Sequence, residues 1–116
     1  MGYKPKEFIV DTAEDFEEMV SAKDFRIAES IVEGIFANVD SKKQNIHLIS
    51  IVCQDEGAVY DITVDKKYFI TTLEENLVHY VREERYEDCQ RIADAIEKLK
   101  KQEVYNIVNQ VSQSKK

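Results

Sequence analysis

The clearest alternation of apolar and polar positions lies in residues 86–99. Apolar side chains recur there at spacings of three and four, the period of one helix face, at Tyr86, Cys89, Ile92, Ala93, Ile96 and Leu99. A similar stripe lies just upstream, and the charged run 82–85 separates the two. The pattern predicts a helical hairpin over residues 71–112. Thr72 followed by Glu75 is typical of a capping box that opens its first helix.

The C-terminal limit of this hairpin is open on the pattern alone. The apolar stripe drifts after Leu99, and it restarts in a different phase further on. Either the last helix continues to about residue 112, or it breaks near residues 100–102. Residues 113–116 are expected to form a frayed tail.

An earlier helical hairpin is predicted over residues 11–38. Asp11 or Thr12 is suited to cap its first helix. The polar break 21–24 precedes a second stripe at Phe25, Ala28, Ile31, Val32, Ile35 and Phe36. Val20 aligns with Val81 at an offset of 61 residues, and the two hairpins keep similar residues at this offset. They are either an internal repeat, which predicts two superposable hairpins with approximate twofold symmetry, or two stretches that share only the helical period.

A β-hairpin is predicted between the helical hairpins, over residues 45–65. Residues 46–53 are rich in β-branched side chains, and 58–64 alternate between apolar and polar. The sequence therefore predicts an α+β fold of order α-α-β-β-α-α, two helical hairpins flanking a central antiparallel β-hairpin.

The strand 46–53 is apolar on both faces if it alternates regularly, and a two-stranded hairpin alone is marginal in water. Its second face needs a cover. The candidates are the run Phe8–Val10, as an edge strand or an extended arm, the helices, or another subunit. This pattern is the main reason to expect a homodimer.

Composition narrows the class of protein. The 116 residues predict a single domain, 1–116, and the few glycines and single proline favour helices over an all-β fold. The net charge of −7 argues against nucleic-acid binding, since phosphate contacts require clustered Lys and Arg. Neither a membrane-spanning run nor a signal peptide is evident, and the two cysteines read as small buried side chains. We therefore expect a cytoplasmic protein that contacts neither membrane nor nucleic acid.

The stretch Val81–Leu99 resembles the UVR motif, a short helical hairpin of bacterial excision-repair proteins and of some protease-regulator proteins. Residues that sit at the motif's positions are Tyr86, Glu87, Cys89, Ile92, Asp94, Ile96 and Leu99. The motif's Arg is Ala93 here, and its small Ala is Cys89. The resemblance covers about a fifth of the chain. It implies a protein–protein contact element without catalytic residues, with Tyr86, Glu87, Arg91 and Asp94 as candidate contacts.

Motifs for catalysis, phosphate binding and zinc binding are missing from the sequence. We therefore expect no cofactor, no metal and no enzymatic activity. The favoured interpretation is a small interaction module or adaptor that acts as a homo-oligomer and binds a protein partner. One alternative is a small-molecule-binding protein with a pocket near Tyr60, His79 and Cys53. Another is an acidic mimic of nucleic acid, suggested by a charge of −6 over residues 1–40.

Overall fold

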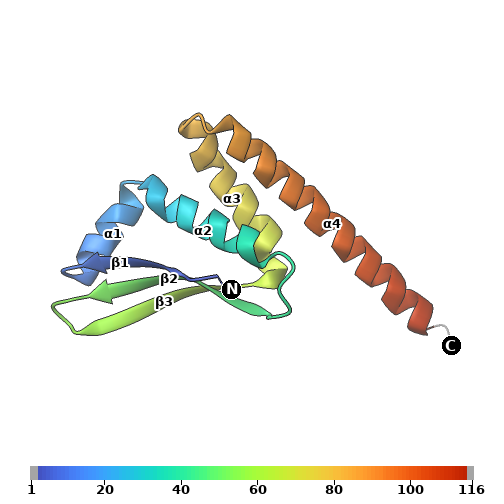
Figure 1. Cartoon of the computed structure of the whole chain (residues 1–116), viewed down its shortest axis with the longest axis horizontal. Coiled ribbons are helices and arrows are strands. Elements are labelled where there is room, and N and C mark those ends of the chain that lie inside the picture. Colours follow the sequence, from blue (N-terminus) through green and yellow to red (C-terminus); the bar gives the residue numbers. More distant parts are fainter. Residues whose placement is uncertain (1–2, 115–116) are drawn as a thin grey trace.

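The computed structural model describes residues 3–114 and the side chains of residues 3–108. Its elements in chain order are β1 (Lys6–Val10), α1 (Ala13–Ser21), α2 (Phe25–Asn38), β2 (Asn45–Cys53), β3 (Ala58–Asp65), the 3-10 turn η1 (Lys66–Tyr68), α3 (Phe69–Arg82) and α4 (Tyr86–Ser114). All four helices lie on the same side of the sheet (Figure 1). Among the described residues, no helix is long and apolar enough to cross a membrane.

The sheet has three strands in the order β1-β2-β3, with β1 parallel to β2 and β2 antiparallel to β3. The fold is α+β, but the predicted order α-α-β-β-α-α and the two-stranded antiparallel sheet are wrong. Phe8 and Val10 are buried and lie opposite Ile51 and Cys53, so the run Phe8–Val10 is an edge strand of the core. Because parallel strands need a long crossover connection, α1 and α2 serve as that crossover.

A β-bulge at Leu48 corrects the expectation that β2 is apolar on both faces. His47 pairs with Thr63 and Ile49 with Ile62, which leaves Leu48 as an extra residue in β2. The extra residue shifts the alternation, so every apolar residue of β2 except Val52 is buried. The open face of the sheet therefore needs no second subunit to cover it, and this reason for expecting a dimer does not hold.

The helix α1 begins at one of the two predicted caps, whereas α3 begins before its predicted cap. Thr12 caps α1, and its hydroxyl accepts from the Asp15 amide while the Asp15 carboxylate accepts from the Thr12 amide. The predicted capping box at Thr72 is wrong, since α3 begins at Phe69. Phe69 is buried, so the core-facing period of α3 begins one turn before the predicted cap.

The two helix-to-helix turns have the same geometry at the predicted offset of 61 residues. Lys23 and Glu84 have positive φ angles of 56° and 57°. The amide following each donates to a carbonyl five residues back, the Schellman arrangement that ends a helix. Arg82 also joins the turns, because its guanidinium donates to the Lys23 carbonyl at 2.9 Å.

The equivalence of the two segments is confined to these turns. The helix α1 has 9 residues and lies on the sheet, where the Phe16 ring is 6.4 Å from that of Phe8. The corresponding helix α3 has 14 residues and packs along α4, which has 29. The predicted first helical hairpin is therefore not a copy of the second, since its two helices bridge parallel strands.

Candidate functional site

The N-terminal half of α4 is anchored to the body of the protein. Ile92 is fully buried, and four further side chains pack partly against the core: Cys89, Ala95, Ile96 and Leu99. Of these five residues, Cys89, Ile92, Ile96 and Leu99 belong to the stripe that the sequence analysis singled out, whereas its other members, Tyr86 and Ala93, are exposed. The stripe therefore serves folding, as its helical spacing suggests.

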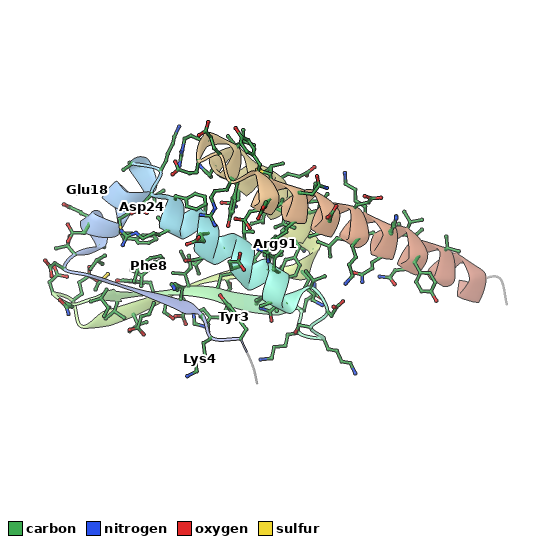
Figure 2. All side chains as sticks on the ribbon, turned by 45° about the horizontal axis from the view of Figure 1, so that its top comes forward. Tyr3, Lys4, Phe8, Glu18, Asp24 and Arg91 are labelled. Carbon is green, nitrogen blue, oxygen red and sulfur yellow. The ribbon has the colours of Figure 1, made fainter. Side chains whose placement is uncertain are left out.

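Ion pairs fix this half of α4 beside α2. Arg85 pairs with Asp88 at 2.8 Å and with Glu29 at 3.5 Å, and Arg91 pairs with Asp88 at 3.0 Å. Arg91 also reaches Glu33 at 3.4 Å and lies 4.6 Å over the Phe36 ring. Figure 2 shows Arg91 on the side of α4 that faces α2. Each exposed pair contributes at most about 1 kcal/mol, and the shared partners join the pairs into a network between α4 and α2.

The Tyr80 hydroxyl lies buried beneath this network. It has no hydrogen-bond partner among the described residues. Burial, followed by the nearby carboxylates of Glu33 and Glu29, holds its pKa well above the usual range. Tyr80 is therefore a neutral core residue, with its ring edge-on to Phe25 at 4.8 Å.

The C-terminal part of α4 leaves the body, and Figure 1 shows it apart from the sheet and the other helices. Every side chain from Lys100 to Val108 is exposed. Four of them are large and apolar: Val104, Tyr105, Ile107 and Val108. At about 100° per residue they span about 160° of the helix surface. We call these four residues the α4 stripe.

The projecting part of α4 is a poor helix former by composition. Val, Ile, Asn and Ser occupy 8 of the 11 positions 104–114. Each costs up to about 0.7 kcal/mol relative to Ala in a helix, and short unsupported helices are marginal in water. A helix of this composition gains its stability from packing of an apolar face. The α4 stripe is such a face, and no described residue covers it.

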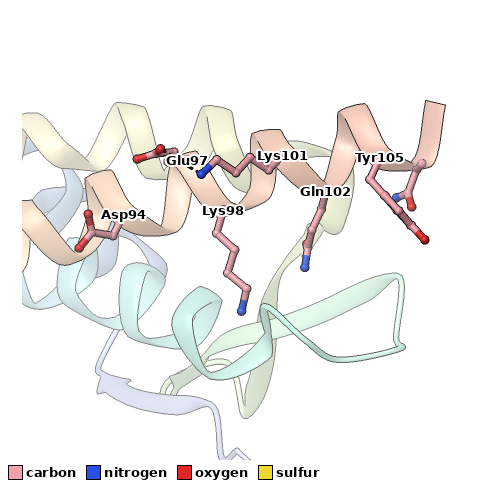
Figure 3. Close-up of a pocket in the computed structure, with 7 residues that line it drawn as sticks. Asp94, Glu97, Lys98, Lys101, Gln102 and Tyr105 are labelled. Carbon is pink, nitrogen blue, oxygen red and sulfur yellow. Dashed lines mark ion pairs between the residues drawn. The ribbon is translucent and has the colours of Figure 1, made fainter. Parts of the chain in front are cut away.

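Two open hollows lie beside the projecting helix, and the first of them reaches Tyr105 of the α4 stripe. One, of about 820 Å³, is lined by Asp94, Glu97, Lys98, Lys101, Gln102, Tyr105 and Asn106 (Figure 3). Its charged groups are already paired, Lys101 with Glu97 at 3.3 Å and Lys98 with Asp40 at 3.3 Å. The other, of about 330 Å³, lies where α4 leaves α3 and includes Ile70 and Leu99. Neither gathers unpaired polar groups toward one point, as a small-molecule site would.

The predicted contact residues take different positions on α4. Tyr86 and Glu87 are exposed in its first turn, and Asp94 accepts a hydrogen bond from Gln90 at 2.9 Å. Arg91 is engaged by α2. The α4 stripe lies further along the helix. Its signal in the sequence was the restart of the apolar period after Leu99.

The residues of the alternative pocket are only partly together. Tyr60 and Cys53 line a hollow of about 220 Å³ with Ala13, Phe16, Glu17 and Ile51. His79 lies elsewhere, in a hollow of about 90 Å³ beside the α1–α2 turn. Burial, followed by the charges of Glu56 and Asp55, raises the pKa of the Cys53 thiol.

A polar cluster that the sequence analysis did not predict lies on the open face of the sheet. The Ser50 hydroxyl is 2.8 Å from His47 Nε2 and donates to Asp61 Oδ1 at 3.0 Å. His47 Nε2 also lies 3.1 Å from the Ile49 carbonyl and 3.2 Å from Asp61 Oδ1. The Ser50 hydroxyl thus donates to the Asp61 carboxylate rather than to His47. The arrangement is therefore not that of a nucleophile with its base.

Comparisons with known proteins assign no function to the α4 stripe or to the polar cluster. No family model fits the chain, and neither a curated protein nor a solved structure is significantly similar to it. The resemblance of Val81–Leu99 to the UVR motif stays a prediction. In the part of the chain that the structure describes, no group of three or more His, Cys, Asp or Glu side chains is arranged to hold a metal ion.

Proposed function

We propose that this chain is a non-enzymatic protein–protein interaction module that forms homo-oligomers through the α4 stripe. The observation that carries the proposal is the projecting part of α4. Its residues have low helix propensity, and no described residue covers its apolar face. A second copy supplies the packing that the helix lacks. A cytoplasmic location fits this proposal, because both described cysteines are free thiols.

Charges beside the α4 stripe favour an antiparallel pair of helices. A parallel pair in register would bring Glu97 and Lys100 each against its own equivalent in the second copy. An antiparallel pair sets Val104 against Ile107 of the second copy and avoids both like-charge contacts. It also places the two bodies at opposite ends of the paired helices.

The contribution of the α4 stripe follows from its exposure. Val104 is 61% exposed and Ile107 59%, so most of each side chain is available for burial. Complete burial of such a side chain contributes about 1.5–3 kcal/mol; since about 60% of each remains to be buried, the four side chains of two copies contribute roughly 4–7 kcal/mol. The double variant V104Q/I107Q should therefore dissociate at least 100-fold more readily.

Native mass spectrometry and light scattering at micromolar concentration test the proposal. The wild type should be a dimer, and V104Q/I107Q a folded monomer, because Gln forms helix better than Val or Ile. The matched control is I9Q/V59Q, which removes an equally exposed Ile and Val, 61% and 59%, from the open face of the sheet. A monomeric wild type, or a control that dissociates as the α4 variant does, would overturn the proposal.

A further inference from the structure

We propose that the free edge of β3 binds an extended basic segment of a partner protein, which adds to the sheet as a fourth strand. The proposal concerns a surface distant in sequence from the α4 stripe, and it does not depend on oligomerisation. Three features of the fold support it: the unpaired edge, its charge, and an apolar hollow beside it.

The edge is long, and its only charged side chains are those of Asp61 and Asp65. The strand β3 spans 8 residues and has a single neighbour, β2, in the sheet. Figure 1 shows β3 at the rim of the sheet, with no further strand beyond it. Edge strands are usually guarded by Lys, Pro or a bulge, because unpaired backbone groups invite another strand. The sequence of β3, AVYDITVD, contains neither Lys nor Pro.

Charge near this edge is of one sign. Residues 54–65 carry four carboxylates and no basic side chain: Asp55, Glu56, Asp61 and Asp65. Glu17 of α1 lines the same hollow as Tyr60, and α1 carries no basic residue. Pairing of β3 with the same strand of a second copy would bring eight carboxylates together, which disfavours that occupant. A strand with Lys or Arg side chains complements the edge.

The hollow lined by Tyr60 and Cys53 gives this edge an apolar recognition element. Its remaining lining includes Phe16 of α1 and Ile51 of β2. Because β3 is the edge strand, Tyr60 is the lining residue nearest the free edge, and it is 48% exposed. An added strand presents alternate side chains to the two faces of the sheet. Apolar side chains on one face can therefore reach the hollow, while basic ones on the open face meet Asp61. Strand addition of this kind draws affinity from the backbone and specificity from such pockets.

The test measures fluorescence anisotropy with labelled seven-residue peptides. The probe alternates Lys and Val, and it should bind with a micromolar Kd that weakens with salt. The first control peptides carry N-methyl groups on alternate backbone amides, in both registers, which keeps the charge and removes donors from one edge. At least one register should bind 10-fold more weakly or worse. A Glu–Val peptide of equal length should not bind.

Protein variants locate the site. D55N/E56Q/D61N should weaken Lys–Val binding at least 5-fold, and Y60A should weaken it without a change in charge. The matched control D94N/E97Q removes carboxylates from α4 and should leave binding unchanged.

Equal binding of all N-methylated peptides, an equal effect of the control variant, or no binding of the Lys–Val peptide would overturn the proposal. Dissociation of a wild-type dimer on addition of the Lys–Val peptide would do so too, by identifying a second copy as the occupant of the edge. V104Q/I107Q should bind the peptide as the wild type does, which keeps this test separate from that of the α4 stripe.

Discussion

Gly34, in the middle of α2, lies against Leu48, the extra residue of β2. A Cβ at this position would lie 2.5 Å from Leu48 Cδ2 and 2.8 Å from Tyr3 Oη. Leu48 is buried, and Tyr3 Oη donates to the Leu48 carbonyl at 3.0 Å. The methyl group of Gly34→Ala therefore has no room unless Leu48 or Tyr3 moves.

Two opposing terms set the size of this effect. Ala stabilises a helix by about 1 kcal/mol relative to Gly, which would make the substitution favourable at an open site. Overpacking of a core costs about 1–3 kcal/mol, and loss of the Tyr3 hydrogen bond adds about 1 kcal/mol. We expect Gly34→Ala to lower the free energy of unfolding by about 1–3 kcal/mol.

Urea denaturation followed by circular dichroism measures this change. A double-mutant cycle with Leu48→Ala tests its cause, because removal of the Leu48 side chain makes room for the methyl group. Gly34→Ala should cost less in the Leu48→Ala background than in the wild type. A stabilising Gly34→Ala, or a cycle without coupling, would refute the close approach as the reason for glycine.

Three further predictions concern the core, a helix cap and the cysteines. Ile92→Ala should cost about 2–5 kcal/mol of unfolding free energy in a urea titration, because Ile92 is fully buried; a cost below 1 kcal/mol would contradict its place in the core. Asp24 caps α2, and its hydrogen bond with the Arg26 side chain holds the pKa of the Asp24 carboxyl below its usual range. The Asp24 carboxylate therefore stabilises the folded state above about pH 4, and this contribution is lost as the pH falls through the lowered pKa. Asp24→Ala should lower the free energy of unfolding by about 1 kcal/mol at pH 7 and by little at pH 2. An equal loss at both pH values would contradict this. Mass spectrometry after brief alkylation should find Cys89 modified and Cys53 intact, because Cys53 is fully buried; equal labelling of the folded protein would contradict it.

The local elements of this chain could be predicted because each is encoded within a few residues. The period of Ile92, Ile96 and Leu99 identified the buried face of α4, and the polar break at residues 82–85 identified its turn. Thr12 was one of two candidates for the cap of α1. These features depend on side-chain spacing and on hydrogen bonds to nearby amides. Both are determined within a few residues, so they do not depend on distant parts of the chain.

The candidate surfaces could be predicted only in part. The apolar restart after Leu99 was visible, but exposure of Val104 and Ile107 depends on the angle at which α4 leaves the body. That angle depends on the packing of α4 along α3 and on Arg85 and Arg91, which contact α2 more than 50 residues away in sequence. The free edge of β3 was hidden in the same way, since an edge exists only once the strand order is known.

The sequence by itself determined that residues 86–99 form an amphipathic helix, that two turns lie 61 residues apart, and that residues 46–64 form two strands. Only the tertiary structure decided that Phe8 and Val10 join these strands in a parallel pairing, and that Leu48 bulges so that β2 buries nearly all its apolar residues. A one-residue shift exchanges the two faces of a strand, and its energy lies in contacts between segments far apart in the chain. Local pattern therefore predicts which elements form, while packing between distant elements selects their register and the surfaces left exposed.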